Sequence, residues 1–219
     1  MRVTTKILMP VVGAALAAFA LSPAQAATVI PVSATASSSY SGYDASYAID
    51  QGGNSADTDW AAGSTGAGSY IDLTLGGDYN LTTAFVTDRV TSGGPNGAFA
   101  GGVTDFTTEY SLQAYTNNSF TTAIGSAKIF YVSVPGSPSS PASFENTQNV
   151  TGLDGEYIRY TILATNGGPN NNPGLSNIEF AGVPVPEPAT WALFLIGFGA
   201  LGFTMRGSRR KQLKSAAAV

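Results

Sequence analysis

The stretch YIDLTL at residues 70–75 alternates large apolar side chains with polar or smaller ones. A period of two is typical of a β-strand that buries one face against a core and leaves the other face in solvent. The runs FTTEYSLQAY at 106–115 and EYIRYTIL at 156–163 have the same character and are rich in aromatic and β-branched residues. These three runs predict a protein built from half-buried strands.

Shorter runs of the same kind occur at 83–87, 128–134 and 175–180. Turn signals rich in glycine, proline and asparagine separate the runs, at 76–78, 93–97 and 166–174. Residues 27–182 show no helical periodicity of useful length, whereas a parallel sheet needs crossover helices. We therefore predict one all-β domain over 27–182, an antiparallel β-sandwich or jelly roll.

The residue types of the 219-residue chain exclude several kinds of catalysis. It contains neither histidine nor cysteine, so catalytic triads and thiolate mechanisms are impossible. Two carboxylates could in principle hydrolyse a glycoside, but no spacing singles out a pair. The glycine-rich stretch 93–97 lacks the lysine and helix of a phosphate-binding loop. We therefore predict that the protein is not an enzyme.

Charge is distributed unevenly along the chain. Seven of its ten basic residues lie near the two ends, whereas residues 27–183 hold three basic residues against thirteen carboxylates. An acidic domain repels phosphate backbones, so we expect no nucleic-acid partner. Basic ends that flank apolar runs indicate contact with a membrane.

The first 26 residues have the order of a secretory signal peptide. Arg2 and Lys6 precede an apolar run from 7 to 21, and Ala24 and Ala26 form a small-residue cleavage site. The alternative is a retained anchor, for which the apolar run is short. We expect a signal helix in the precursor, and cleavage after Ala26 by signal peptidase once the secretion machinery has engaged the chain.

The other end of the chain has three parts. Residues 183–188 (VPVPEP) are predicted to be extended because proline excludes helix from the residue before it. Residues 189–205 are apolar and uncharged, and as a helix they would span roughly 25 Å, close to the thickness of a bilayer core. We predict a transmembrane helix there, with residues 206–219 as a basic cytoplasmic tail. The residues that stop transfer are Arg206, Arg209, Arg210 and Lys211.

This tripartite tail resembles the PEP-CTERM sorting signal in its PEPxxWA form. The matching residues are Pro186, Glu187, Pro188, Trp191 and Ala192. The resemblance implies that an exosortase, a membrane transpeptidase of Gram-negative bacteria, recognises the motif at the inner membrane. It also implies removal of the helix and delivery to the cell surface or the extracellular matrix.

The order of segments in the domain is similar to that of discoidin domains, the coagulation-factor type C or galactose-binding-like jelly rolls. The segments that carry the similarity are ASSSY at 36–40, AID at 48–50, TDW at 58–60, YIDLTLG at 70–76, DFTTEYS at 105–111, YIRY at 157–160 and NPGLSNIEFAG at 172–182. The paired cysteines of animal members are absent, and the segment from 50 to 60 is longer than usual.

The resemblance implies a structural Ca²⁺ ion between the loop before Trp60 and the last strand. The ligand positions would be Asp50, Thr58 and Glu179, with Asp57 or Asn54 as further donors. Carboxylates, hydroxyls and carbonyls are the hard oxygen ligands that calcium prefers. The alternative is a solvated acidic loop without an ion.

Sugar-binding candidates lie at predicted loop tips. They are Tyr40, Tyr43, Arg89, Asn96 and Phe99. An aromatic ring gives a platform for a sugar, and the arginine fork can donate to hydroxyl groups. For Arg89 the alternative is an ordinary surface pair with Asp88, and for the amides of 166–172 it is a turn-rich loop. We expect Trp60 to be a core residue rather than a sugar-stacking one.

Together these features predict an exported, non-catalytic module that binds extracellular polysaccharide. One alternative is a structural matrix or adhesin subunit without a specific small ligand. A glycosidase is the remaining alternative.

Overall fold

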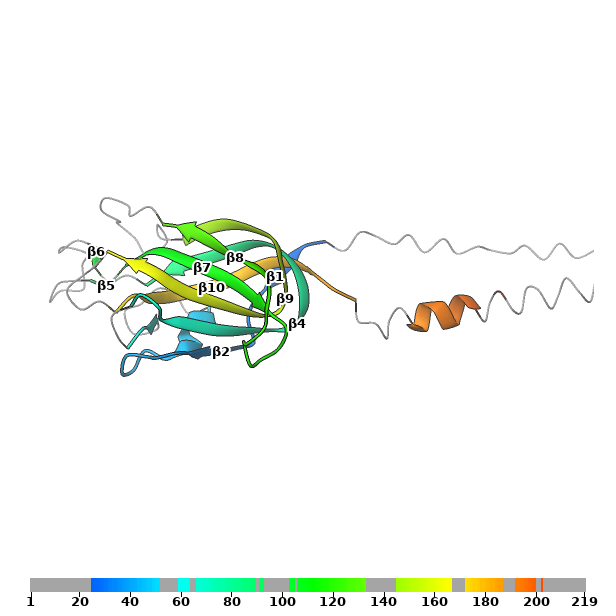
Figure 1. Ribbon diagram of the computed structural model, residues 1–219, viewed down its shortest axis with the longest axis horizontal. Coiled ribbons are helices and arrows are strands. Elements are labelled where there is room, and N and C mark those ends of the chain that lie inside the picture. The colour runs from blue at the N-terminus through cyan, green and yellow to red at the C-terminus, as the bar shows by residue number, and fades with distance from the viewer. Residues whose placement is uncertain are drawn as a thin grey trace, which may run out of the picture.

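The computed structural model describes residues 25–51, 59–63, 66–89, 91–92, 103–104, 106–132, 145–166, 172–186, 192–199 and 202. It confirms an all-β antiparallel fold (Figure 1). The elements are β1 (Ala27–Val29), β2 (Ser33–Ala36), the 3-10 helix η1 (Ala45–Ile49), β3 (Trp60–Ala61), β4 (Tyr70–Asp88), β5 (Thr91–Ser92), β6 (Val103–Thr104), β7 (Thr107–Tyr115), β8 (Ala123–Tyr131), β9 (Glu145–Thr165) and β10 (Gly174–Pro184).

Two long strands are shared by both layers of the sandwich. The first half of β4 pairs with the second half of β9, and this layer continues through β7 to β8, with β2 on the other side of β4. The second half of β4 pairs with the first half of β9 and with β10, which also pairs with β1 and β3. One continuous sheet, in the order β1-β10-β4-β9-β7-β8, thus folds over on itself.

The bend in β4 corrects one expectation. The glycine pair at 76–77 was expected to separate two strands, but β4 runs through it. Gly76 adopts φ 77°, and the register with β9 shifts between Thr74 and Tyr79. A bulge therefore turns the strand into the other layer without ending it.

The other strand bounds differ from expectation more modestly. The run expected at 128–134 is β8, which begins at Ala123, and β9 begins eleven residues before the expected Glu156. The short strands β1 and β2 were not predicted, because few of their residues are buried.

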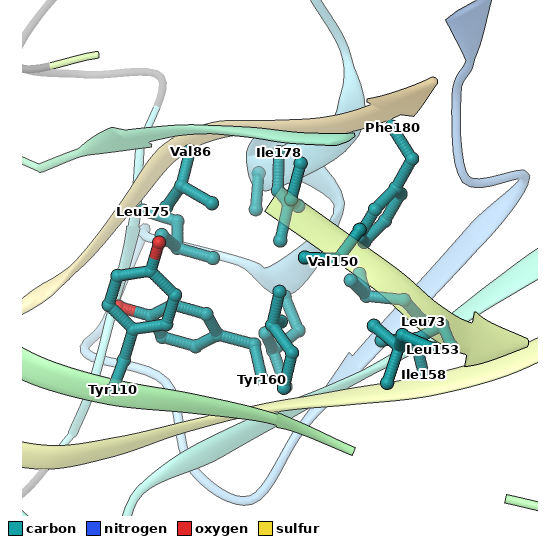
Figure 2. Packing of buried hydrophobic residues seen from close by; sticks show 14 of the residues in the cluster. Leu73, Val86, Tyr110, Val150, Leu153, Ile158, Tyr160, Leu175, Ile178 and Phe180 are labelled. Atoms are coloured by element: carbon teal, nitrogen blue, oxygen red, sulfur yellow. The ribbon is translucent and has the colours of Figure 1, made fainter. Parts of the chain in front are cut away.

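The core lies between the two layers. Ile71, Leu73 and Leu75 are buried, as the alternation at 70–75 predicts. Figure 2 shows Tyr110, Tyr160 and Ile158 of one layer facing Val86, Ile178 and Phe180 of the other. Trp60 is fully buried, which confirms that it is a core residue.

The sandwich has two distinct ends. At the tail end, Ala27 pairs with Gly182, and the amide of Val185 donates to the Asp78 carbonyl. At the loop end, β4 finishes at Asp88 where β10 starts, and the β5–β6 ribbon lies there (Figure 1). The polypeptide chain therefore enters and leaves the described domain at its tail end.

Candidate functional site

Three of the predicted sugar-binding residues lie together at the loop end. The Tyr40 and Tyr43 ring centroids are 5.8 Å apart, with the rings tilted by 52°. The Arg89 Cζ lies 4.8 Å from the centroid of the Tyr43 ring. Tyr40 is 50% exposed, Tyr43 is half-buried and Arg89 is only 7% exposed. Tyr40 is therefore the member of this group that solvent reaches most easily, while the Arg89 guanidinium lies against the Tyr43 ring.

Backbone hydrogen bonds hold in place the segment from Tyr40 to Tyr43, which is called the tyrosine loop. The Tyr40 amide donates to the Ala61 carbonyl at 2.8 Å, and the Tyr43 amide donates to the Tyr40 carbonyl at 2.9 Å. The Trp60 indole donates to the Ser38 carbonyl at 3.1 Å. A buried tryptophan and a short strand thus fix both tyrosines from below, which gives a preorganised rather than a mobile platform.

Arg89 does not occupy the loop tip that the sequence indicated. Its amide donates to the Gly174 carbonyl at 3.1 Å, and its Nη1 donates to the Asn172 carbonyl at 2.7 Å. The Asn172 amide in turn donates to the Ala62 carbonyl at 2.8 Å. Because β4 continues to Asp88, the next residue is still held against the start of β10. Arg89 therefore supports the site from beneath.

The alternative surface pair between Asp88 and Arg89 is also wrong. Asp88 is 2% exposed, and its carboxylate oxygens have no hydrogen-bond partner among the described residues. Burial raises the pKa of Asp88 well above its ordinary value. The nearby Thr107 hydroxyl lowers this pKa by less, and it does not reach hydrogen-bonding geometry. Burial therefore favours the protonated form of Asp88 over the charged form.

The hydroxyls of two core tyrosines lie close enough to Asp88 to interact with it electrostatically. Tyr110 and Tyr160 stack with centroids 4.9 Å apart (Figure 2). Their buried hydroxyls have no hydrogen-bond partner among the described residues. Burial, and secondarily the Asp88 charge, raises the pKa of both phenols. These buried polar groups lie in the core beneath the loop end, out of reach of a polymer.

A second buried acid lies beside the tyrosine loop. Asp59 is 3% exposed, and its Oδ1 accepts from the Ser176 hydroxyl at 2.5 Å. Burial raises the pKa of Asp59, while the Ser176 hydrogen bond and the Arg89 charge lower it and the Asp50 charge raises it. Asp50, Asp59 and Arg89 are thus close enough to interact electrostatically.

Two of the predicted calcium ligands lie in the described part. Asp50 is exposed at the end of η1, and Glu179 is half-buried on β10. Gln51, which follows Asp50, has φ 57°, and its Nε2 donates to Asn177 Oδ1 at 2.9 Å. This bond ties the exit of η1 to the strand that carries Glu179. Within the described ranges, three acidic side chains do not come together as a metal-binding group.

Several predicted residues fall outside the described ranges. They are Asn54, Asp57 and Thr58 of the calcium loop, Asn96 and Phe99 of the sugar site, Glu187, Pro188 and Trp191 of the sorting motif, and the basic residues Arg206, Arg209, Arg210 and Lys211. Pro186 is exposed, and residues 192–199, which include Ala192, are helical and exposed. In the part that the structure describes, no helix has the length and apolarity needed to span a membrane.

Sequence reasoning missed a polar and aromatic group on the outer face of the sheet. Arg159 Nε and Nη2 donate to Asp72 Oδ1 and Oδ2 at 2.6 and 2.9 Å. The Arg159 Cζ lies 3.9 Å from the Tyr70 ring centroid, and the rings of Tyr115 and Phe120 are 5.2 and 5.4 Å away. The alternation of β4 and β9 places such residues outward, but only the strand pairing joins them.

Residues 33–178, more than half of the chain, match the family model of the F5/8 type C domain. The chain belongs to the F5/8 type C domain family. Residues 184–211 match the PEP-CTERM protein-sorting motif. Both resemblances drawn from the sequence are thereby confirmed. No curated protein matches the sequence.

Several solved structures are similar to this F5/8 type C domain. One is the family 32 carbohydrate-binding module of NanJ from C. perfringens in complex with galactose, with 21% identity, a TM-score of 0.46, and coverage of 70% of this chain and 98% of that one. Another is the family 32 module of AlyQ in complex with 4,5-unsaturated mannuronic acid, with 17% identity, a TM-score of 0.47, and coverage of 70% of this chain and 97% of that one. A third is the Streptococcus pneumoniae fucose-binding module SpX-3, with 11% identity, a TM-score of 0.49, and coverage of 70% of this chain and 96% of that one.

Proposed function

We propose that this F5/8 type C domain is a non-catalytic carbohydrate-binding module, displayed by its PEP-CTERM tail outside a Gram-negative cell. The observation that carries the proposal is the position of the Tyr40–Tyr43–Arg89 group at the loop end, while β10 leads toward the sorting motif at the tail end. A module tethered at the tail end presents this group away from the membrane, where an extracellular polysaccharide can reach it.

The chemistry of the loop end suits a sugar. Tyr40 offers an exposed ring face for the C–H surface of a pyranose. At the same end, the Asn172 carbonyl binds Arg89 and the Asn172 side-chain amide binds Ala62, and each keeps a second lone pair or N–H for a sugar hydroxyl. Because Arg89 and the backbone already fix these groups, binding orders few side chains, which favours affinity.

The buried acids support a binding role rather than catalysis. Asp59 and Asp88 have raised pKa values, which is a property of many general acids. Both carboxyls are 3% exposed or less, so a glycosidic oxygen cannot approach them. Among the described carboxyls with a raised pKa, these two therefore serve the core and not a reaction.

Binding tests the proposal directly. The full-length protein, held in detergent, would be run through native gels that contain exopolysaccharide from the producing cells. We expect retardation that Tyr40→Ala reduces roughly tenfold, since loss of one stacked ring costs about 1.4 kcal/mol. A folded wild-type protein that migrates alike in all gels contradicts the proposal.

We further propose that one Ca²⁺ ion bridges Asp50 and Glu179, with the remaining ligands supplied by 52–58. Two observations support this calcium site. The Gln51–Asn177 bond holds the residue after Asp50 against β10, and the Asp50 charge acts on Asp59, so that hard oxygen atoms lie close together next to β10. The ion would hold the loop before Trp60 against the last strand and so steady the base of the tyrosine loop.

One observation favours a second candidate function, a structural matrix subunit. The edge strand β8 exposes Ile124 and Ile129, by 41% and 52%. An edge with apolar side chains can pair with a second copy. Concentration-dependent sedimentation without any polysaccharide affinity would favour this role over the first.

A further inference from the structure

The outer face of the β4–β9–β7 layer carries a second group of aromatic residues. On β4, Tyr70 and Asp72 alternate with buried residues, and on β9 Tyr157 and Arg159 do the same. The register places Asp72 opposite Arg159, and Tyr157 opposite Tyr115 of β7. Tyr70, Asp72, Tyr115, Phe120, Tyr157 and Arg159, all half-buried, are called the sheet-face group.

The rings of the sheet-face group touch one another in a continuous series. The Tyr115 and Phe120 centroids are 5.5 Å apart, and those of Phe120 and Tyr157 are 6.0 Å apart and nearly perpendicular. Arg159 links this series to Tyr70, because its guanidinium lies near three of the four rings. The rings therefore form one patch rather than isolated side chains.

The charge at the centre of this patch is balanced. Asp72 binds Arg159 through two nitrogen–oxygen contacts, and the two side chains are 15% and 20% exposed. A pair held in this way keeps both side chains fixed while one nitrogen of the arginine fork, Nη1, is not used by Asp72. The patch thus combines aromatic surface with a charge-balanced pair, and the carboxylates of Glu156 and Asp78 act on its Tyr157 ring, so no excess positive charge is present among these residues.

The backbone at Phe120 is strained in a way that serves this patch. Phe120 has φ 49°, a left-handed conformation that a bulky residue adopts only at a cost of order 1–3 kcal/mol. The turn is fixed by a Phe120 amide to Asn117 carbonyl bond of 3.1 Å and a Thr116 amide to Thr122 carbonyl bond of 3.0 Å. The consequence of the strain is that an apolar ring is held on an outer sheet face next to polar residues instead of in the core.

We propose that the sheet-face group is a second carbohydrate-binding site, which takes uncharged pyranose units of a polysaccharide. The proposal rests on the proposed carbohydrate-binding function but concerns a different face from the tyrosine loop. An uncharged sugar fits because the Arg159–Asp72 pair has no spare charge for a uronate. The thirteen carboxylates of residues 27–183 disfavour an acidic polymer as well.

A site on the sheet face changes how the module holds a polymer. The tyrosine loop lies at the loop end, whereas Tyr115 and Phe120 lie where β7 leads into β8, toward the tail end. One chain of sugar units, or two neighbouring chains, can contact both sites. Two weak sites on one rigid body raise the total affinity through effective concentration.

Single and double variants of the full-length protein test the inference in gels that hold the neutral or the acidic fraction of exopolysaccharide from the producing cells. We expect Tyr157→Ala to weaken retention in the neutral gel roughly five- to tenfold, Tyr157→Phe to keep it, and Tyr157→Ala with Tyr40→Ala to abolish it. The matched control is the exposed Tyr131, changed to alanine (Tyr131→Ala). Tyr131 pairs with Glu109, which lies six residues, or roughly 20 Å, along β7 from Tyr115. This variant should change nothing.

A measurement on the wild-type protein avoids any question of folding. Nitration of Tyr157 by tetranitromethane should slow severalfold when the neutral fraction is added, while nitration of Tyr131 keeps its rate. If Tyr40→Ala removes binding but Tyr157→Ala and its nitration are unaffected, the sheet-face site is overturned and the proposed function stands. If the wild type is not retained in either gel, the proposed function fails and the second site fails with it.

Discussion

Gly174 lies so close to the Trp60 carbonyl group that no side-chain carbon fits between them. The contact joins β10 to β3, where Gly174 pairs with Ala61. Backbone therefore meets backbone at the point where the last strand begins. This close approach sets the position of the Arg89 amide, which binds the Gly174 carbonyl.

Gly174→Ala should destabilise the domain by about 3 kcal/mol, the upper part of the range for overpacking, because neither backbone can move aside. Gly77→Ala is the matched control, since its new carbon would meet only the edge of the Tyr79 ring at an ordinary 3.7 Å. Urea unfolding measures both. Equal midpoints for the two variants would show that the Trp60 contact is not rigid.

Asp88→Asn should stabilise the protein at pH 7 and reduce the dependence of stability on pH. The raised pKa means that folded Asp88 keeps a proton which the unfolded chain releases above about pH 4. Stability therefore falls as the pH rises above this value, and below it the residue has no effect. Thermal unfolding between pH 3.5 and 8 checks this.

In the same scans, exposed Asp154→Asn is the control for loss of a carboxylate. Asp59, whose pKa is also raised, leaves some of the pH dependence in the Asp88 variant. A pH profile of Asp88→Asn that is identical to wild type would mean that Asp88 is ionised in the fold.

Removing calcium should lower the unfolding temperature if the proposed ion is present. A ligand at one hundred times its dissociation constant contributes about 2.7 kcal/mol, or roughly 5–10 °C for a domain of this size. Glu179→Gln should show the lower temperature with or without chelator, while exposed Glu145→Gln should behave as wild type. An unchanged midpoint after chelation rules the ion out.

Protein recovered from the medium should have lost both ends. Cleavage after Ala26 and processing at Pro186-Glu187-Pro188 leave a product that lacks the apolar stretch and the basic tail. Intact mass measures both cuts together. Replacing Glu187 by Gln should retain the longer form in the membrane fraction, whereas a full-length chain in the cytosol would contradict export.

The fold was predictable because its strands bury one face and so carry a period of two. The alternation at 70–75 and 156–163 indicated both the strands and their core residues. The bend at Gly76 was not predictable, since a glycine in a bulge and a glycine in a turn give the same local signal.

The candidate site was predictable only in part. Tyr40 and Tyr43 are local neighbours, so the sequence could place them together. The location of Arg89 depends on where β4 ends and on its pairing with β10. Asp72 and Arg159 are 87 residues apart, and no local pattern reveals that two such strands are adjacent.

The opposite placement of the loop end and the tail end determines how the module bears mechanical load. When a polymer held at the loop end pulls against an anchor joined to β10, the force runs lengthwise along that strand. The ladder bonds between β10 and β4 lie across the strands, so they are strained in shear all at once rather than opened one after another. A domain loaded in this direction therefore has to break these hydrogen bonds together before β10 can separate from β4.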